Sequence, residues 1–457
     1  MKRLAIAAAA VLLIPAGMSA QTAGGGISAD MLKEISKGYA GTAADKALRN
    51  ALNTTSITVL AENADNLAMI DTHFSDKVKT RGITDQKSSG RCWLFSGLNV
   101  LRARMIDKFD LGDFTFSQNY LFFYDQLEKA NLFLQGVIDT RDLPFDDRKV
   151  DWLFANPIGD GGQFTGVSNL IMKYGLVPAE VMPETLNANS TSAMSTQIKT
   201  LLRQDGLKLR AAGRRDDLQA MKTEMLKDVY HILALCLGVP PTEFEWARYN
   251  SKGEFVSSKV YTPKAFYEEF IGADLENNYI MVMNDPTREY YKVYEIENYR
   301  NCYEGVNWVY LNLPNEEMKA GALATIKDGE AVYASCDWRK GMVKPANSMT
   351  CDSYDYDSLF GMEFGMDKKA RILTRFSASA HAMLIIACDT DENDKPTKWK
   401  FFNSWFDTGE KSTLTFTDEW FDGYIFRLAL NRKYLSEKAL QALETKHVML
   451  PFWDYMN

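Results

Sequence analysis

The 457-residue chain has few of the residues that usually mark metal, redox or nucleic-acid sites. It has four histidines and six dispersed cysteines, with no Cys-x-x-Cys pair and no His-Glu-x-x-His motif, so we predict no metal centre and no cofactor. It has no run of lysines and arginines, and its formal net charge of −8 gives no electrostatic footprint for nucleic acid. After the first twenty residues, no apolar run is long enough to cross a membrane.

The first 20 residues read as a separate segment. Basic residues at positions 2 and 3 precede an apolar run over 4–15, and small residues follow. This pattern is typical of a secretory signal peptide, here cleaved after Ser19 or Ala20. A membrane anchor is the alternative, but the apolar run is short for a spanning helix. We therefore predict an exported protein, periplasmic or secreted, without a membrane anchor.

The stretch 86–97 reads Gln-Lys-Ser-Ser-Gly-Arg-Cys-Trp-Leu-Phe-Ser-Gly, a polar loop followed by apolar residues at helical spacing. It predicts a helix that begins at or near Cys92. A thiol in the first turn of a helix faces unpaired N–H groups and the positive end of the helix dipole, which favours the reactive thiolate. Gln86 and the backbone N–H of Cys92 can then donate to an oxyanion. A structural cysteine at a helix start is the alternative, so the prediction depends on a base.

His381 is the best candidate base by elimination among the four histidines. It follows the small residues 377–380 and opens a predicted strand, which can aim an imidazole into a cleft. His231 lies in an amphipathic helical pattern and is expected in a core or groove. His447 is expected in solvent, and local hydrogen bonding explains His73.

Asn403 is the candidate residue for orienting the imidazole. It ends the next predicted strand, which can run antiparallel beside the strand of His381. Its side-chain carbonyl can accept a hydrogen bond from the imidazole, and Trp405 can shield that bond from water. The four candidate catalytic residues are therefore Gln86, Cys92, His381 and Asn403.

The chain changes from helical to strand-rich patterns after about residue 279, which predicts an α+β enzyme with its site between two lobes. We expect six parts along the chain: a signal peptide (1–20), an N-terminal helical extension (21–70), a helical catalytic lobe (71–186), a mostly helical insertion (187–275), a β-rich catalytic lobe (276–446) and a C-terminal tail (447–457).

The order Gln, Cys, His, Asn resembles that of the papain-like cysteine peptidases. His381 follows Cys92 by 289 residues, whereas simple members have about 130–150. Such a large, mostly helical insertion resembles the bleomycin hydrolase/aminopeptidase C group. Further segments resemble that group as well, namely 117–123 (SQNYLFF), 160–163 (DGGQ), 174–178 (YGLVP), 283–286 (MNDP), 380–383 (AHAM), 417–421 (TDEWF) and 450–454 (LPFWD).

The resemblance implies a papain-like two-lobed fold, an aminopeptidase acting on peptide substrates, a homohexamer, and a C-terminal tail directed to the active-site cleft. On this sequence the substrate cleft falls on Trp93, Gly161, Gly162, Trp405 and Asn457. The chain departs from the group in two places. It has Phe406 where Gly is usual after Asn-Ser-Trp, and its tail stops a few residues early.

The short tail leaves other activities open. An endopeptidase or dipeptidyl-peptidase is one alternative, because a shorter tail brings its carboxylate to a different place. Acyl transfer by the same residues is a second alternative, and a non-catalytic assembly protein is a third.

Overall fold

A computed structural model describes residues 25–67, 71–82, 84–213, 215–338, 340–343, 348–405 and 412–456. The predicted signal peptide, Phe406 and Asn457 lie outside the described residues. The chain divides into two compact units, one up to Ala61 and one from Glu62 onwards. Within the described residues, no helix is long and apolar enough to cross a membrane.

The described part of the first unit, from residue 25 onwards, contains three short helices, α1 (Ala29–Lys37), α2 (Ala43–Leu52) and α3 (Ile57–Ala61). Ser28 caps α1, and Thr42 and Asp45 form a capping box at the start of α2. Neither α1 nor α2 has a buried residue. Local capping therefore accounts for much of the helical structure expected in the N-terminal extension.

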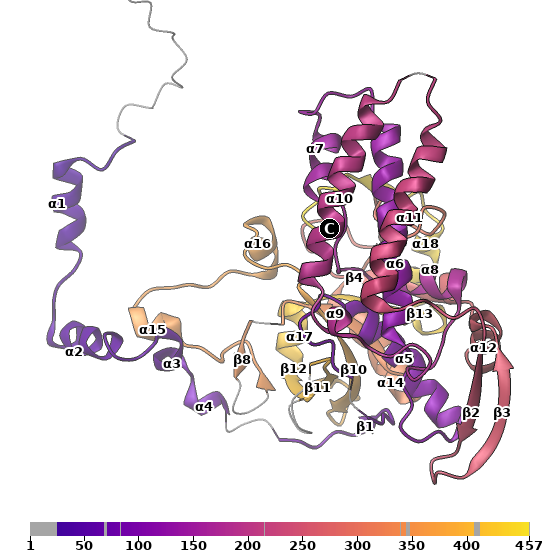
Figure 1. Ribbon diagram of the computed structural model, residues 1–457. Coiled ribbons are helices and arrows are strands. Elements are labelled where there is room, and N and C mark those ends of the chain that lie inside the picture. Colours follow the sequence, from indigo (N-terminus) through magenta and orange to yellow (C-terminus); the bar gives the residue numbers. More distant parts are fainter. Residues whose placement is uncertain are drawn as a thin grey trace, which may run out of the picture. The chain divides into compact units, whose positions relative to one another are not determined.

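The second unit contains the helix that carries the predicted nucleophile and a group of helices beside it. α5 (Cys92–Phe109) begins at Cys92, as the apolar spacing predicts, and most of its residues are buried. α6 (Gln118–Asp139) begins after its N-cap residue Ser117 and stands beside α10 and α11 in a tall group of helices (Figure 1). The other helices before the large sheet are α4 (Ala64–Leu67), α7 (Arg148–Ala155), α8 (Phe164–Tyr174), α9 (Leu186–Asn189), α10 (Ser192–Ala211), α11 (Leu218–Leu237), α12 (Pro263–Phe270) and α13 (Leu275–Asn278).

The region predicted as a mostly helical insertion also contains a β-hairpin that the helical pattern did not predict. β2 (Phe244–Tyr249) pairs antiparallel with β3 (Phe255–Tyr261). Six of the seven residues of β3 are exposed. The strand therefore lacks the alternation of buried and exposed residues by which a strand is recognised in a sequence. The hairpin is the non-helical part of a region that is otherwise mostly helical.

Among the described residues, eleven strands from the second half of the chain form one sheet in the order β14-β5-β6-β4-β13-β7-β10-β11-β12-β9-β8, and β1 from the first half pairs with β10 as its twelfth strand. The strands are β1 (Asp76–Lys77), β4 (Tyr279–Met283), β5 (Lys292–Ile296), β6 (Val309–Asn312), β7 (Val332–Cys336), β8 (Met342–Val343), β9 (Ser348–Met349), β10 (His381–Thr390), β11 (Pro396–Phe402), β12 (Thr413–Thr417), β13 (Ile425–Asn431) and β14 (Val448–Leu450). The accompanying helices are α14 (Asn315–Lys327), α15 (Tyr356–Phe360), α16 (Lys368–Leu373), α17 (Asp418–Tyr424), α18 (Glu437–Leu443) and the 3-10 turn η2 (Arg432–Tyr434). The predicted α+β class is confirmed.

The sheet and α5 meet along β10. The first eight residues of β10 are buried, and β7 and β11 flank it on both sides in antiparallel register. The hydroxyl of Ser96 on α5 donates to the carbonyl of Ala382 at 3.0 Å. The helix that starts at Cys92 is thus fixed against the strand that starts at His381.

Candidate active site

Cys92 is the first residue of α5, and its N-cap residue Arg91 makes no side-chain capping bond. The thiol is partly exposed. Burial raises the pKa of Cys92, while backbone hydrogen bonding by Ala382, Trp93 and Cys92 itself lowers it, and the net direction is upward. The helix start alone therefore does not give the thiolate expected from the sequence, because desolvation outweighs the backbone dipoles. A base must take the proton.

The strand whose backbone contacts the thiol also carries the predicted base. Ala382, whose backbone hydrogen-bonds the sulfur, directly follows His381. His381 Nε2 lies 2.9 Å from Asn403 Oδ1, and both side chains are buried. β10 and β11 pair antiparallel, with Leu384 opposite Phe402, so the two strands carry His381 and Asn403 to the same place. This is the arrangement predicted for the base and its orienting residue.

Two tryptophans enclose the imidazole. The ring of Trp405 stacks on His381 with centroids 4.2 Å apart and an interplanar angle of 25°. Trp338, which the sequence analysis did not identify, lies 5.8 Å from the His381 ring and 4.3 Å from the Trp405 ring. Stacked aromatic faces reduce the access of water to the His381–Asn403 hydrogen bond, which is then electrostatically stronger.

Gln86 is buried beside the start of α5 and is fixed at both ends of its amide. Its Oε1 accepts a hydrogen bond from Ser404 Oγ at 2.6 Å, and its Nε2 donates to the carbonyl of Ser89 at 2.6 Å. An amide nitrogen has two hydrogens, and the second is available for an oxyanion. Ser404 was missed in the sequence, because only the fold brings it to Gln86.

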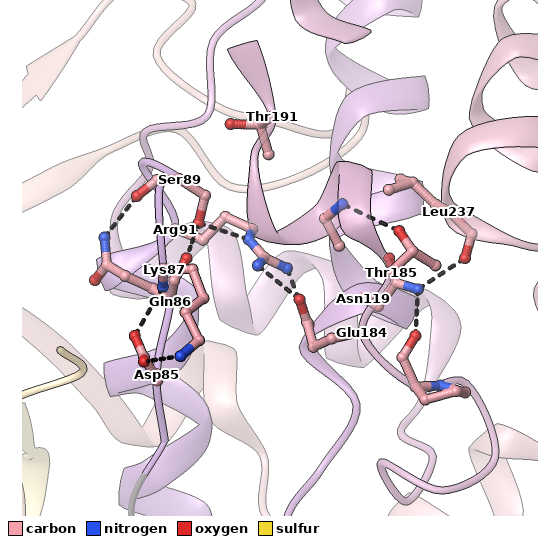
Figure 2. Close-up of polar contacts among 12 residues, drawn as sticks. Asp85, Gln86, Lys87, Ser89, Arg91, Asn119, Glu184, Thr185, Thr191 and Leu237 are labelled. Carbon is pink, nitrogen blue, oxygen red and sulfur yellow. Dashed lines mark hydrogen bonds and ion pairs between the residues drawn. The ribbon is translucent and has the colours of Figure 1, made fainter. Parts of the chain in front are cut away.

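The loop before Cys92 is held by a partly buried ion pair (Figure 2). Arg91 donates to both carboxylate oxygens of Glu184, at 3.0 and 2.7 Å, and through Nε to Ser89 Oγ at 2.9 Å. Ser89 Oγ in turn donates to the carbonyl of Gln86 at 2.6 Å. A bidentate pair of this kind adds geometric specificity as well as energy. The loop therefore presents Gln86 and Cys92 in one fixed arrangement.

Gly161 and Gly162 form a wall next to this loop. A Cβ added at Gly162 would lie 2.6 Å from the Trp93 ring, so only glycine fits there. The Trp93 indole donates to the carbonyl of Asp160 at 2.7 Å, which ties the wall to α5. A Cβ at Gly161 would meet no atom within 4 Å. Gly162 thus allows this turn to approach the Trp93 ring closely.

The C-terminal tail follows β14 and packs against the main unit. Phe452 is buried against Trp152, with ring centroids 4.8 Å apart. Asp454 pairs with Arg288 at 2.6 Å. Met456 is buried, and its backbone carbonyl accepts a hydrogen bond from Arg427. The last described residues are therefore anchored, whereas Asn457 lies outside the described residues.

The remaining histidines lie away from this cluster in the sequence and in their contacts. His231 is exposed on α11, so its expected place in a core or groove is wrong, because its helix face turns to solvent. His447 is half-buried and lies 2.8 Å from Glu295, so it is less solvated than predicted. His73 is exposed, and its backbone N–H donates to Asp71 as part of a local turn.

All six cysteines lie among the described residues, and none forms a disulfide. Cys92 is thus not bridged to another cysteine. A separate apolar cavity of about 580 Å³ borders Gly161 and Gly162, with Phe133, Trp152 and Phe452 among its lining residues.

The fold and these groups define a papain-like cysteine peptidase: a cysteine at a helix start, a histidine on a neighbouring strand, an asparagine that holds the imidazole, and a glutamine beside the thiol. The chain matches the model of the Peptidase C1-like family over residues 26–457 and belongs to that family.

Curated relatives place it within the bleomycin hydrolase/aminopeptidase C group. It is 37% identical over 442 residues to aminopeptidase C of Lactobacillus delbrueckii subsp. lactis, which covers 94% of this chain and 98% of that protein. It is 37% identical over 439 residues to aminopeptidase C of Lactococcus lactis subsp. cremoris, which covers 94% and 99%. The crystal structure of PepW from Lactobacillus rhamnosis HN001 superposes with a TM-score of 0.90 at 34% identity, covering 94% of this chain and 99% of that one.

Proposed function

We propose that this protein is an exported aminopeptidase that releases N-terminal residues from peptides through a thioester on Cys92. The observation that carries the proposal is the anchored tail, whose Met456 carbonyl is held by the buried Arg427 of the central sheet. If the end of the tail extends into the cleft, it blocks the path of a peptide that extends beyond its own N-terminus. The relatives named aminopeptidase C support the same activity.

In the proposed mechanism, His381 takes the proton of Cys92, and the thiolate attacks the scissile carbonyl carbon. The carbonyl oxygen becomes an oxyanion, which accepts hydrogen bonds from Gln86 Nε2 and the Cys92 N–H. His381 then protonates the leaving amine, and the C–N bond breaks to leave a thioester. Water, deprotonated by His381, hydrolyses the thioester and restores the thiol. Asn403 holds the imidazole throughout both steps.

The deciding experiment compares one tetrapeptide with a free N-terminus and the same tetrapeptide carrying an N-acetyl group. An aminopeptidase cleaves the free peptide after its first residue and leaves the acetylated one intact. Release of a dipeptide, or cleavage of the blocked peptide at an internal bond, would favour the dipeptidyl-peptidase or endopeptidase alternative. Cys92→Ser is the control, since it removes the nucleophile.

Two other activities are separated by further measurements. If added amines divert the acyl-enzyme into new amides in preference to hydrolysis, the protein is an acyl transferase. If a thiol-alkylating peptide probe fails to label Cys92, it is a non-catalytic assembly protein.

Export and assembly complete the proposal. The basic, apolar and small residues over 1–20 support cleavage by a signal peptidase, and N-terminal sequencing of protein recovered outside the cytoplasm tests it.

A homohexamer is supported by the apolar side chains exposed along the segment 356–376 (Phe360, Met362, Phe364, Leu373 and Phe376). Light scattering gives the mass, and a monomer in solution would contradict the hexamer.

A further inference from the structure

Arg427 lies at the centre of the sheet, on β13, where its backbone is opposite Met283 of β4 and Ser335 of β7. Its side chain is 3% exposed. The guanidinium carbon sits 3.8 Å from the centroid of the Trp308 ring, and Nη2 donates to the backbone carbonyl of Met456. The side chain of this sheet arginine thus hydrogen-bonds the last described residue of the tail.

Among the described residues, the charge of this arginine has no close counter-ion. Burial lowers the pKa of Arg427 to about 10, so it remains charged at neutral pH. No carboxylate lies within 4.0 Å of it among the described residues, and its buried Nε has no hydrogen-bond partner there. A buried charge without a counter-ion is costly, and breaking one of its few contacts is strongly unfavourable. The Met456 carbonyl and the Trp308 face are its main compensation.

Arg427 is also close to the catalytic centre. Tyr333 on β7 is fully buried and interacts electrostatically with both the Cys92 thiol and Arg427. Phe164, two residues after Gly162, packs on Tyr333 with ring centroids 5.5 Å apart. The strand register agrees with this, because Ser335 of β7 lies opposite both Arg427 of β13 and Ala382, the neighbour of His381 on β10.

The earlier part of the tail is held by a different arginine. Arg288 pairs with Asp454 at 2.6 Å and lies 4.7 Å from the Tyr455 ring centroid. The Tyr455 hydroxyl also hydrogen-bonds Thr287. These contacts fix the tail as far as residue 455. The contact with Arg427 comes after them and is the one that determines where the final residues lie.

We propose that Arg427 is the specificity-determining residue that fixes the end of the tail, and so restricts cleavage to peptides with a free N-terminus. This inference rests on the proposed aminopeptidase function and names the residue that enforces it. Arg427 acts through the tail and is a positioning residue, since it does not contact the reacting atoms.

The test replaces Arg427 by methionine, which keeps an unbranched side chain and removes the charge and the donors. We expect the ratio of kcat/KM for the free peptide to that for its N-acetylated form to fall at least 10-fold. The change should come from a higher KM for the free peptide and new cleavage of the blocked one. Arg427→Lys should restore part of the ratio, because it keeps the charge.

Arg371 offers a matched control. It donates to two backbone carbonyls, of Met366 at 2.7 Å and Gly423 at 2.8 Å, whereas Arg427 donates to one, and its guanidinium lies 4.5 Å from the Tyr424 ring centroid. Arg371→Met removes contacts of the same kinds, to carbonyls and an aromatic ring that are not part of the tail, so the ratio should stay within 2-fold of wild type. A chain that ends at Asp454 lacks the carbonyl that Arg427 holds. In that background Arg427→Met should have no further effect on the ratio.

Hydrogen exchange provides a readout that does not depend on activity. The Met456 amide, which donates to Asp454 Oδ1 at 3.0 Å, should exchange at least 10-fold faster in Arg427→Met than in wild type. A folded Arg427→Met variant with unchanged exchange and an unchanged peptide ratio would overturn the inference. If wild type itself cleaves the blocked peptide equally well, the aminopeptidase proposal fails. Exchange at Met456 then still decides whether Arg427 holds the tail.

Discussion

Gln86 and Ser404 are 318 residues apart in the chain and are joined by two hydrogen bonds. The Gln86 backbone N–H donates to the Ser404 carbonyl at 2.8 Å, and Ser404 Oγ donates to Gln86 Oε1 at 2.6 Å. Ser404 directly follows Asn403, so Gln86, the candidate oxyanion donor, is hydrogen-bonded to the segment that carries the residue orienting His381. The positions of the oxyanion donor and of the base therefore depend on the same segment.

Substitution of Ser404 tests this link. Gln86→Ala should lower kcat by about 10²- to 10³-fold, as loss of an oxyanion donor does. Ser404→Ala removes one hydrogen bond, worth about 0.5–1.5 kcal/mol, and should lower kcat by about 2- to 13-fold. Because Ser404 acts through Gln86, the double variant should be no slower than Gln86→Ala alone. Additive losses would show that Ser404 acts elsewhere.

The glycine wall allows a paired comparison. Gly162→Ala forces a Cβ against the Trp93 ring and should lower the free energy of unfolding by about 1–3 kcal/mol, as overpacking does. Gly161→Ala places its Cβ in open space and should change stability by less than about 0.5 kcal/mol. Urea denaturation measures both. Equal stability of the two variants would contradict the close packing at Gly162.

The pH dependence of alkylation tests the coupling of Cys92 and His381. Burial raises the pKa of Cys92 above its ordinary value of 9.0. In His381→Ala no imidazole accepts the proton, so alkylation by iodoacetamide should rise only above pH 9. In wild type we expect reaction at lower pH, because His381 stabilises the thiolate. The rate is followed by mass spectrometry of the peptide that contains Cys92. Identical pH profiles would exclude an imidazolium–thiolate pair.

The burial of Lys368 at the start of α16 should make the free energy of unfolding depend on pH. Its Nζ donates to Asn284 Oδ1 at 2.8 Å and to the Ile425 carbonyl at 2.6 Å. Burial lowers the pKa of Lys368 from 10.5 to about 7. Between these two pH values the unfolded chain binds more protons than the folded one, so this residue makes stability rise with pH, by up to about 1.4 kcal/mol per pH unit.

Lys368→Met should remove that rise and leave the slope outside this pH range unchanged. The free energy of unfolding, measured by urea denaturation at intervals from pH 6 to pH 10, provides the test. A wild-type slope that survives the substitution would assign the titration to another group. Lys369→Met, one position along on the exposed side of the same helix, is the control.

Much of this arrangement could be predicted from the sequence because it depends on local patterns. Apolar spacing after Cys92 predicted a helix that begins at that residue, and the strand-rich patterns after about residue 279 predicted the β-rich half of the chain, including the strands β10 and β11 of His381 and Asn403. The proximity of His381 and Asn403 was predicted because they lie on two consecutive strands, which can pair antiparallel. Each of these features needs only residues close together in the chain.

The rest depends on contacts between distant residues, which no local pattern records. Ser404, Trp338 and the Arg91–Glu184 pair acquire their roles only when the fold brings them to the site. The exposed hairpin β2–β3 lacks the alternating buried face by which a strand is recognised. The raised pKa of Cys92 was also missed, because the helix dipole can be inferred from a sequence but the extent of desolvation cannot.

Met456 has one practical implication for handling the protein. Its side chain is 3% exposed, and Phe452 four residues earlier is buried to the same degree. An affinity tag or fusion partner joined after Asn457 would therefore begin two positions beyond an interior residue. A removable label that leaves no added residues after Asn457 would keep the packing around Met456 undisturbed.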